Sequence, residues 1–190
     1  MRRRTIISTL SAGAALVALA VLTPHHQARA GELLAHDFAF PGIEGETVRL
    51  ADWAGKPVLV VNTASRCGFT YQYDGLQALY DRYRERGLVV LGVPSGDFNQ
   101  ELASNEEVKE FCAVNFAIDF PMTAISPVKG NSAHPFYTWA TREAGTGPRW
   151  NFHKYLVGPD GRLAASFGTS VEPTAPEVTE AIERLLPAGS

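Results

Sequence analysis

The sequence predicts an α/β domain with a central mixed sheet flanked by helices and with a β-hairpin at its N-terminal end. Two continuous runs of β-branched and apolar residues, at 58–62 and 88–93, are typical of strands buried on both faces. Between these runs, apolar residues recur at helical spacing from Leu76 to Tyr83. A helix between two buried strands is the connection that parallel strands need, so the sheet is expected to start as a βαβ unit.

The first elements can be assigned in chain order. Apolar residues alternate at 36–40 and again at 47–50, on either side of a glycine-containing turn, and this pattern predicts a hairpin. Gly87 follows the first helix and suits its C-terminal cap. The polar and acidic run 104–107 has the composition of a helix start. The helix that follows is expected to present one face made of Val108, Phe111, Cys112 and Asn115.

The second half of the chain continues the pattern. A third strand is expected at 120–125 and a third helix at 134–143. A Gly-Pro-Asp-Gly sequence between 154–157 and 163–167 predicts a second hairpin, and an amphipathic helix at 177–186 closes the chain. A βαβ unit followed by a hairpin and a last helix is the order of a thioredoxin-type domain.

The first thirty residues have the three parts of a secretory signal peptide. Three arginines follow the initial methionine, an apolar run spans 6–22, and a small-x-small ending lies at 28–30. We therefore predict a bacterial export signal at 1–30, which resembles a twin-arginine signal at Arg3-Arg4, and one folded domain at 31–190. The alternative is that the segment 1–30 stays attached as an uncleaved signal anchor in the membrane. The mature protein is expected in the periplasm or outside the cell, with no stable membrane association after cleavage.

The charge balance argues against a nucleic-acid partner. The chain has 17 Lys and Arg against 20 Asp and Glu, and four of the arginines lie in the export segment. Without them, 13 basic residues face the same 20 acidic ones, so the net charge moves from −3 to −7. An acidic domain of this kind repels a phosphate backbone. The composition, 45% hydrophobic and 19% charged, is that of an ordinary globular protein.

The two cysteines of the chain, Cys67 and Cys112, are too few for a disulfide scaffold or a zinc ribbon but enough for one redox couple. Cys67 falls between the first buried strand and the first helix, where a helix dipole and free backbone N–H groups favour a thiolate. The alternative is an inert, buried thiol. We expect no metal and no cofactor, because the histidines have no ligand spacing and fit solvent-facing or helix-start positions: His36, His134 and His153.

Three ordered segments carry a resemblance to a known family. They are similar to the three signatures of the glutathione peroxidase family, in its cysteine-containing, non-selenium form, and the likeness spans 38–185. Because three motifs in order are more specific than one, the chain is identified as a member of this family. The matching segments are 56–62 with 64–70, then 91–94 with 98–101, and last 150–157.

The resemblance implies four catalytic residues. Cys67 matches the peroxidatic nucleophile, and Gln100, Trp150 and Asn151 match the residues around it. Two amides and an indole N–H are donors that can stabilise a thiolate and a departing alkoxide without acting as nucleophiles. The loop before Gln100 is one residue shorter than in the family pattern, and Leu102 replaces a proline there, so the placement of Gln100 rests on its neighbour Glu101.

The segment that ends in Cys112 resembles the thioredoxin-dependent subtype of the family. There, a second cysteine in a Glu-Glu-x-x-x-Phe-Cys stretch resolves the sulfenic acid, and 106–112 matches that stretch. The alternative is a core thiol beside Val108 and Phe111. Both interpretations, the resolving cysteine and the core thiol, hold if Cys112 is packed in the reduced protein and is exposed when its helix unravels.

The resemblance implies an enzyme, a glutathione peroxidase-like peroxidase that reduces hydrogen peroxide and organic hydroperoxides. Its partners are the peroxide and a thioredoxin-like or glutathione reductant. The resemblance also implies a monomer, because tetrameric members of the family carry a long insertion where this chain has only the short segment 144–149. An alternative is a peroxide-sensing redox relay that oxidises a partner protein. A disulfide oxidoreductase or metal chaperone is disfavoured, because Cys67-Gly68-Phe69-Thr70 lacks a second cysteine.

Overall fold

The computed structural model describes residues 31–187, and its compact unit begins at Leu33. The predicted export signal at 1–30 lies outside the described residues and stays a prediction. Within the described range, no helix is both long enough and apolar enough to cross a membrane.

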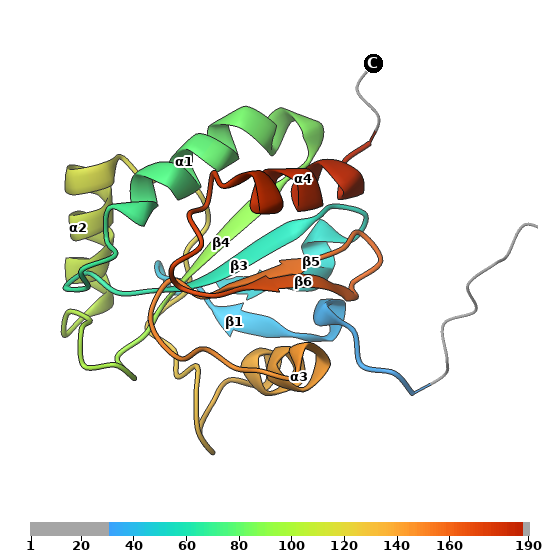
Figure 1. Cartoon of the computed structure of the whole chain (residues 1–190). Helices are drawn as coiled ribbons and strands as arrows, with labels where there is room; N and C mark the ends of the chain where they lie inside the picture. The colour runs from blue at the N-terminus through green and yellow to red at the C-terminus, as the bar shows by residue number, and fades with distance from the viewer. Residues whose placement is uncertain (1–30, 188–190) are drawn as a thin grey trace, which may run out of the picture. The chain divides into compact units, whose positions relative to one another are not determined.

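The centre of the domain is a four-stranded mixed sheet, as predicted, with the strand order β4-β3-β5-β6 (Figure 1). β3 pairs with β4 in parallel and with β5 antiparallel, and β6 pairs antiparallel with β5. All six residues of β3 and of β4 are buried, in agreement with their continuous apolar sequences. The strands are β3 (Val58–Thr63), β4 (Val89–Pro94), β5 (Lys154–Val157) and β6 (Leu163–Phe167).

Four helices and a hairpin cover the two faces of the sheet. Leu59 and Val61 point into one apolar cluster with α1, α2 and α4, whereas Val58 and Val60 point into a second cluster with α3 and the hairpin. Figure 1 shows α1 and α4 on one side of the sheet and α3 on the other. The remaining elements are β1 (Ala39–Pro41), β2 (Thr47–Arg49), α1 (Gln72–Tyr83), α2 (Asn105–Phe116), α3 (Pro135–Ala144) and α4 (Pro176–Leu185), with short 3-10 helices at Ala35–Asp37, Leu50–Trp53 and Arg84–Arg86.

The ends of the helices follow from local sequence signals. Ser104 caps α2 by accepting a hydrogen bond from the Glu107 amide, and the Glu107 side chain accepts in return from the Ser104 amide. The predicted cap at Gly87 is confirmed, with φ of 103°, although a 3-10 turn separates it from the end of α1. His134 accepts from the Phe136 amide at the start of α3, which confirms it as a helix-start residue.

The predicted strand at 120–125 is wrong. This segment runs beside β4 but forms only isolated bridges, from Met122 to Gly92 and from Thr123 to Gly42. The reason is Pro121, which has no amide hydrogen and can offer only its carbonyl, here to the Gly92 amide. The sheet therefore ends at β4.

Candidate active site

Cys67 lies at the carboxyl end of the central strand β3, in the turns that lead into α1. Its side chain is 4% exposed and its thiol is free. The amide of Phe69 donates to Sγ at 3.4 Å, and the amide of Thr70 donates to the Cys67 carbonyl at 3.1 Å. A backbone N–H that points at sulfur stabilises a negative charge there, so this turn is suited to hold a thiolate.

Gln100 and Asn151 are brought together next to the Cys67 turn. Asn151 Nδ2 donates to Gln100 Oε1 at 3.1 Å, and the Gln100 carbonyl accepts from the Arg66 amide at 2.8 Å. Because its side-chain oxygen is engaged, Gln100 keeps its NH₂ group to donate to a ligand. The structure therefore joins two of the predicted site residues to the turn that carries Cys67, despite the shortened loop before Gln100.

Trp150 lies at the surface of the same region. Its side chain is 38% exposed, and its ring packs against Phe98 with the centroids 5.3 Å apart. Among residues 31–187 no group accepts a hydrogen bond from its indole N–H. The indole N–H is therefore available to a bound molecule, as the chemistry of the predicted site requires.

Asn62, a residue that sequence reasoning gave no role, anchors the segment with Trp150 and Asn151. Its Nδ2 donates to the Trp150 carbonyl at 3.1 Å, and its Oδ1 accepts from the His153 amide at 3.1 Å. The backbone of Phe152, at φ of 62°, also donates to the Asn62 carbonyl. The available signal was a polar residue that ends the apolar run of β3 and is nonetheless buried.

Glu101 is a second residue that was missed. Its Oε1 accepts from the Ser65 amide at 2.9 Å and from its neighbour Leu102 at 2.8 Å. The carboxyl group therefore ties the loop of Gln100 to the turn of Cys67. Burial raises the pKa of Glu101, and the hydrogen bond from Ser65 opposes this rise.

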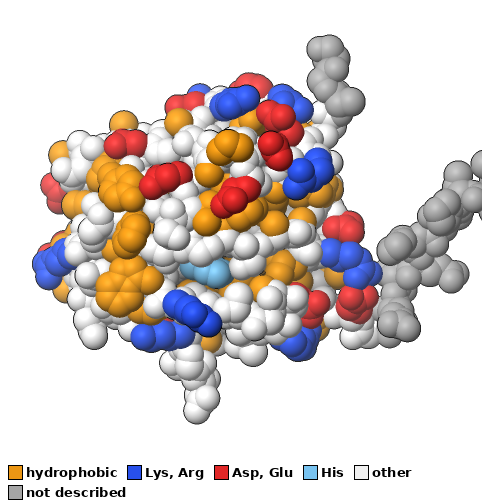
Figure 2. Space-filling model, in the orientation of Figure 1, with side chains coloured by type: hydrophobic (Ala, Val, Ile, Leu, Met, Phe, Trp, Pro, Cys, Tyr) orange, Lys and Arg blue, Asp and Glu red, His pale blue; other side chains and the backbone are white. Residues whose placement is uncertain are grey.

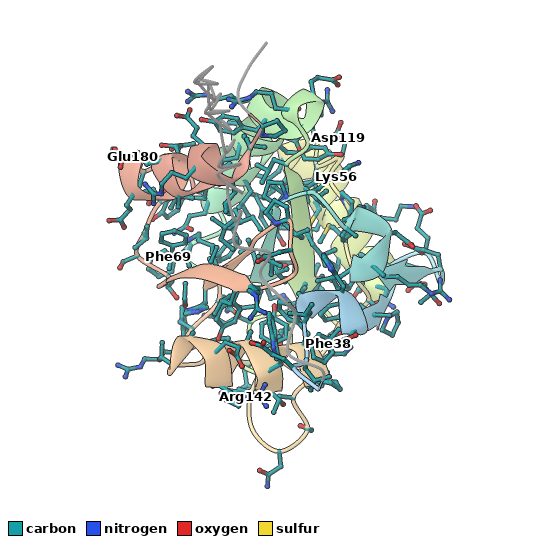
Figure 3. All side chains as sticks on the ribbon, turned by 90° about the vertical axis from the view of Figure 1, so that its right-hand side faces the viewer. Phe38, Lys56, Phe69, Asp119, Arg142 and Glu180 are labelled. Carbon is teal, nitrogen blue, oxygen red and sulfur yellow. The ribbon has the colours of Figure 1, made fainter. Side chains whose placement is uncertain are left out.

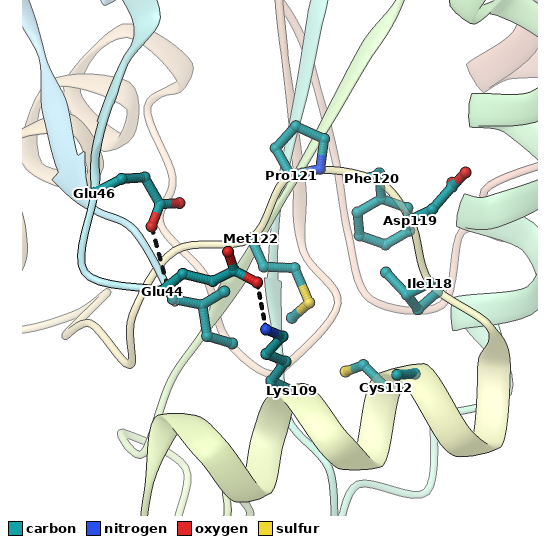
Figure 4. Close-up of a pocket in the computed structure, with 11 residues that line it drawn as sticks. Glu44, Glu46, Lys109, Cys112, Ile118, Asp119, Phe120, Pro121 and Met122 are labelled. Atoms are coloured by element: carbon teal, nitrogen blue, oxygen red, sulfur yellow. Dashed lines mark hydrogen bonds and ion pairs between the residues drawn. The ribbon is translucent and has the colours of Figure 1, made fainter.

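Cys112 lies on the buried side of α2, where its side chain is 1% exposed. It belongs to the same apolar cluster as Cys67 and is also a free thiol. Burial raises the pKa of the Cys112 thiol to about 11, so it is protonated at neutral pH. Figure 4 shows its side chain beside a cavity of about 300 Å³ that is also bounded by Lys109 and Met122. The interpretation as a packed core thiol therefore describes the reduced protein.

His153 corrects one expectation. It was expected at a solvent-facing or helix-start position, but it directly precedes β5, is 5% exposed, and its Nε2 lies 2.9 Å from Ser166 Oγ. Burial lowers the pKa of His153 to about 4, so the ring is neutral at pH 7. Within the described residues, no three His, Cys, Asp or Glu side chains are grouped so as to hold a metal ion.

The side chain of Lys154 is buried and hydrogen-bonds to three segments near the site. Its Nζ donates to Gln72 Oε1 at 2.6 Å, to the Phe152 carbonyl at 2.8 Å and to the Val171 carbonyl at 2.5 Å. These contacts join the start of α1, the segment after Asn151 and the loop after β6. Burial lowers the pKa of Lys154 to about 8, and Glu172 opposes this.

The lowered pKa of Lys154 predicts how the free energy of unfolding depends on pH. Between about pH 8 and the ordinary lysine pKa of 10.5, the unfolded chain binds a proton that the folded protein has lost. The unfolding free energy of the wild-type protein should therefore rise through this window relative to Lys154→Met, by up to about 3 kcal/mol. Chemical denaturation of both proteins at pH 8 and pH 10 measures the change. A difference that is the same at both pH values would contradict the assignment.

The sequence matches known peroxidases along most of its length. The sequence model of the glutathione peroxidase family matches residues 35–141. A glutathione peroxidase of Lactococcus lactis subsp. cremoris is 43% identical over 157 residues, which cover 80% of this chain and 98% of that protein. The hydroperoxy fatty acid reductase of Synechocystis is 38% identical over 162 residues, covering 80% of this chain and 95% of that protein.

Solved structures agree with this match. The crystal structure of Trgpx in apo form has 33% identity and a TM-score of 0.63, and covers 82% of this chain and 100% of that chain. The crystal structure of T. cruzi GPX1 has 28% identity and a TM-score of 0.62, and covers 80% of this chain and 94% of that chain. A DsbF structure at 13% identity, with a TM-score of 0.58, covers 80% of this chain and 96% of that chain and shares the thioredoxin-like fold alone.

Proposed function

Because this chain belongs to the glutathione peroxidase family and is a thiol-dependent peroxidase, we propose that Cys67 is its peroxidatic cysteine, with Gln100, Trp150 and Asn151 as its catalytic partners. The observation that carries the proposal is the convergence of separate segments on the Cys67 turn. Asn151 is bonded to Gln100, and Gln100 is bonded to Arg66 beside the nucleophile.

The proposed first step is attack of the Cys67 thiolate on one oxygen of the peroxide. An S–O bond forms, the O–O bond breaks, and the sulfur is oxidised to a sulfenic acid. The other oxygen leaves as an alkoxide or hydroxide and takes up, by way of solvent, the proton that the Cys67 thiol released when it ionised. The NH₂ group of Gln100 and the indole N–H of Trp150 would stabilise this developing charge as hydrogen-bond donors.

The proposed second step uses Cys112 as the resolving cysteine. Its sulfur attacks the sulfenic sulfur, the S–S bond forms, and the sulfenic oxygen leaves as water with the proton of the Cys112 thiol. A thiol that is buried and protonated cannot do this in place. We therefore infer that α2 opens locally during the catalytic cycle, which its position at the surface allows.

Opening of α2 gives a prediction for amide exchange. Oxidation by one equivalent of hydrogen peroxide should lower protection in the helix at 106–116, because a disulfide to Cys67 draws Cys112 out of its packed position. Protection in α4 serves as the internal reference. Hydrogen exchange with mass spectrometry measures both helices in the reduced and oxidised protein. Unchanged protection at 106–116 in the oxidised form would contradict the opening.

The reductant proposed for the Cys67–Cys112 disulfide is a thioredoxin-like protein, and glutathione is the weaker candidate. A glutathione peroxidase-like peroxiredoxin of Schizosaccharomyces pombe, 39% identical over 143 residues covering 73% of this chain and 90% of that protein, supports a peroxiredoxin-type cycle. Steady-state turnover with thioredoxin and with glutathione tests the choice. A scavenger cycles many times, whereas a sensing relay stops at a mixed disulfide with one partner.

The proposed location of the mature protein is the periplasm or the exterior of the cell, on the strength of the leader sequence at 1–30. In that compartment the thiol donor must itself be supplied with electrons from the membrane or the cytoplasm. We also propose a monomer, since only a short segment lies between the end of α3 and Trp150. N-terminal sequencing of the exported protein and its sedimentation would test these two points.

A further inference from the structure

Tyr73 lies between the segment of the peroxide site and the helix that carries Cys112. It belongs to the first turn of α1, and its side chain is 0% exposed. The centroid of its ring lies 5.2 Å from that of Phe152, the residue after Asn151, and 5.1 Å from that of Phe116, the last residue of α2. Tyr73 therefore contacts the segments that serve both halves of the proposed catalytic cycle.

The hydroxyl group of Tyr73 is buried without a hydrogen bond of normal geometry in the described part of the chain. It lies beside the Cys112 thiol, where it opposes the rise that burial causes in the pKa of this thiol. A thiol is only a weak donor and a weak acceptor, so this contact does not replace the hydrogen bonds to water that the hydroxyl loses on burial. Further buried oxygens without a partner lie around the same position: Thr63 Oγ1, Ser65 Oγ and Glu101 Oε2.

These unpartnered atoms make the packed position of α2 costly. A buried hydroxyl that forms no hydrogen bond has lost its hydration free energy without compensation, and native proteins rarely keep such groups. Of the 12 residues of α2, only Val108 and Cys112 are buried, and Figure 2 shows charged and hydrophobic side chains at the edge of the molecule where Figure 1 places this helix. When α2 opens, Cys112 and Phe116 move away from Tyr73, and water can then bind the hydroxyl.

We propose that Tyr73 is a positioning residue for the resolving step, because its unpaired hydroxyl lowers the free energy needed to open α2. In the reduced protein the hydroxyl is buried against Cys112, and in the open form it is hydrated. The hydroxyl forms and breaks no covalent bond, and it takes no part in the reaction of Cys67 with peroxide. The proposal rests on the opening of α2 that is proposed above.

Removal of this one oxygen atom tests the proposal. Tyr73→Phe keeps the ring contacts and makes the packed form of α2 more stable, so amide exchange at 106–116 in the reduced protein should slow about tenfold. The rate constant for formation of the Cys67–Cys112 disulfide should fall by the same factor, whereas the rate constant for oxidation of Cys67 by hydrogen peroxide should not change. Hydrogen exchange with mass spectrometry and quenched alkylation after rapid mixing measure these quantities.

Tyr137→Phe is the matched control. Tyr137 lies in α3, is 1% exposed, and has a buried hydroxyl that also lacks a partner among residues 31–187, but it belongs to the apolar cluster on the other face of the sheet. Figure 3 shows Asp119, just beyond α2, and Glu180 of α4 on one side of the sheet and Arg142 of α3 on the other. This variant loses the same atom and should leave exchange in α2 and the rate of disulfide formation unchanged.

Two results would overturn the proposal. Exchange in α2 that is unchanged or faster in Tyr73→Phe would show that the hydroxyl does not destabilise the packed helix. Slower exchange to the same extent in Tyr73→Phe and Tyr137→Phe would show a general gain in stability instead of an effect on α2. The exchange measurement needs no peroxide, so it is separate from the function proposed for Cys112. Failure of that function would show as wild-type protein that forms no disulfide.

Discussion

Replacement of Cys67 by serine is expected to abolish peroxide reduction, with a loss of at least a thousandfold in kcat/KM. A serine hydroxyl at the same place remains protonated at neutral pH and is not oxidised by peroxide, so no sulfenic acid can form. The hydrogen-bonded frame around the site does not depend on sulfur, because Gln100 and Asn151 are bonded to each other and to the turn through amides. Coupled turnover with hydrogen peroxide and thioredoxin measures the effect.

The control for this variant is a test of folding. A serine side chain is smaller than a cysteine side chain, but at Cys67 its oxygen can accept the hydrogen bond that the Phe69 amide donates to sulfur, in a turn that backbone hydrogen bonds define. Circular dichroism and the denaturation midpoint should therefore change little. Activity that survives in Cys67→Ser would show that another group reduces the peroxide and would remove the basis of the proposed function.

Replacement of Cys112 by serine is expected to separate the two halves of the cycle. The first turnover should proceed at close to the wild-type rate, because Cys112 lies in α2 and takes no part in the hydrogen bond between Gln100 and Asn151. Steady-state turnover with thioredoxin should fall at least a hundredfold, since no intramolecular disulfide forms. Excess peroxide should then drive Cys67 to the sulfinic acid. Stopped-flow and steady-state measurements on the same preparation give both rates.

A buried serine carries its own cost, so Cys112→Ala is the second variant. Alanine leaves no unpaired hydroxyl in the apolar cluster around α2. The two variants should agree in their loss of turnover. If both keep wild-type steady-state rates with thioredoxin, the external thiol reduces the sulfenic acid directly and Cys112 is only a core residue.

Most of the fold could be predicted because its elements carry strong local patterns. The buried strands β3 and β4 are continuous apolar runs, and the hairpin of β5 and β6 has a turn sequence between its strands. The strand predicted at 120–125 does not form, because apolar side chains alone do not make a strand and Pro121 has no amide hydrogen to donate to a neighbouring strand. Periodicity reports which side chains are buried, but a strand also needs a partner with free donors and acceptors.

The site was less accessible to sequence reasoning from residues alone. Gln100 and Asn151 lie far apart in the chain, and only the family resemblance brought them together in advance of the geometry. Asn62 and Glu101 act by holding other segments in place, and such contacts leave no periodic trace in a sequence. The burial of His153 likewise depends on packing against β6. Long-range hydrogen bonds decide these positions, and they are properties of the folded chain.

If Cys67 and Cys112 form one catalytic couple, one equivalent of hydrogen peroxide should change the intact mass of the reduced protein in a defined way. The wild-type protein should lose the mass of two hydrogens and become inert to thiol alkylation, because the two sulfurs have formed a disulfide. Cys112→Ser should instead gain the mass of one oxygen, and Cys67→Ser should not change. A wild-type protein that gains one oxygen and keeps a thiol that can be alkylated would contradict the couple.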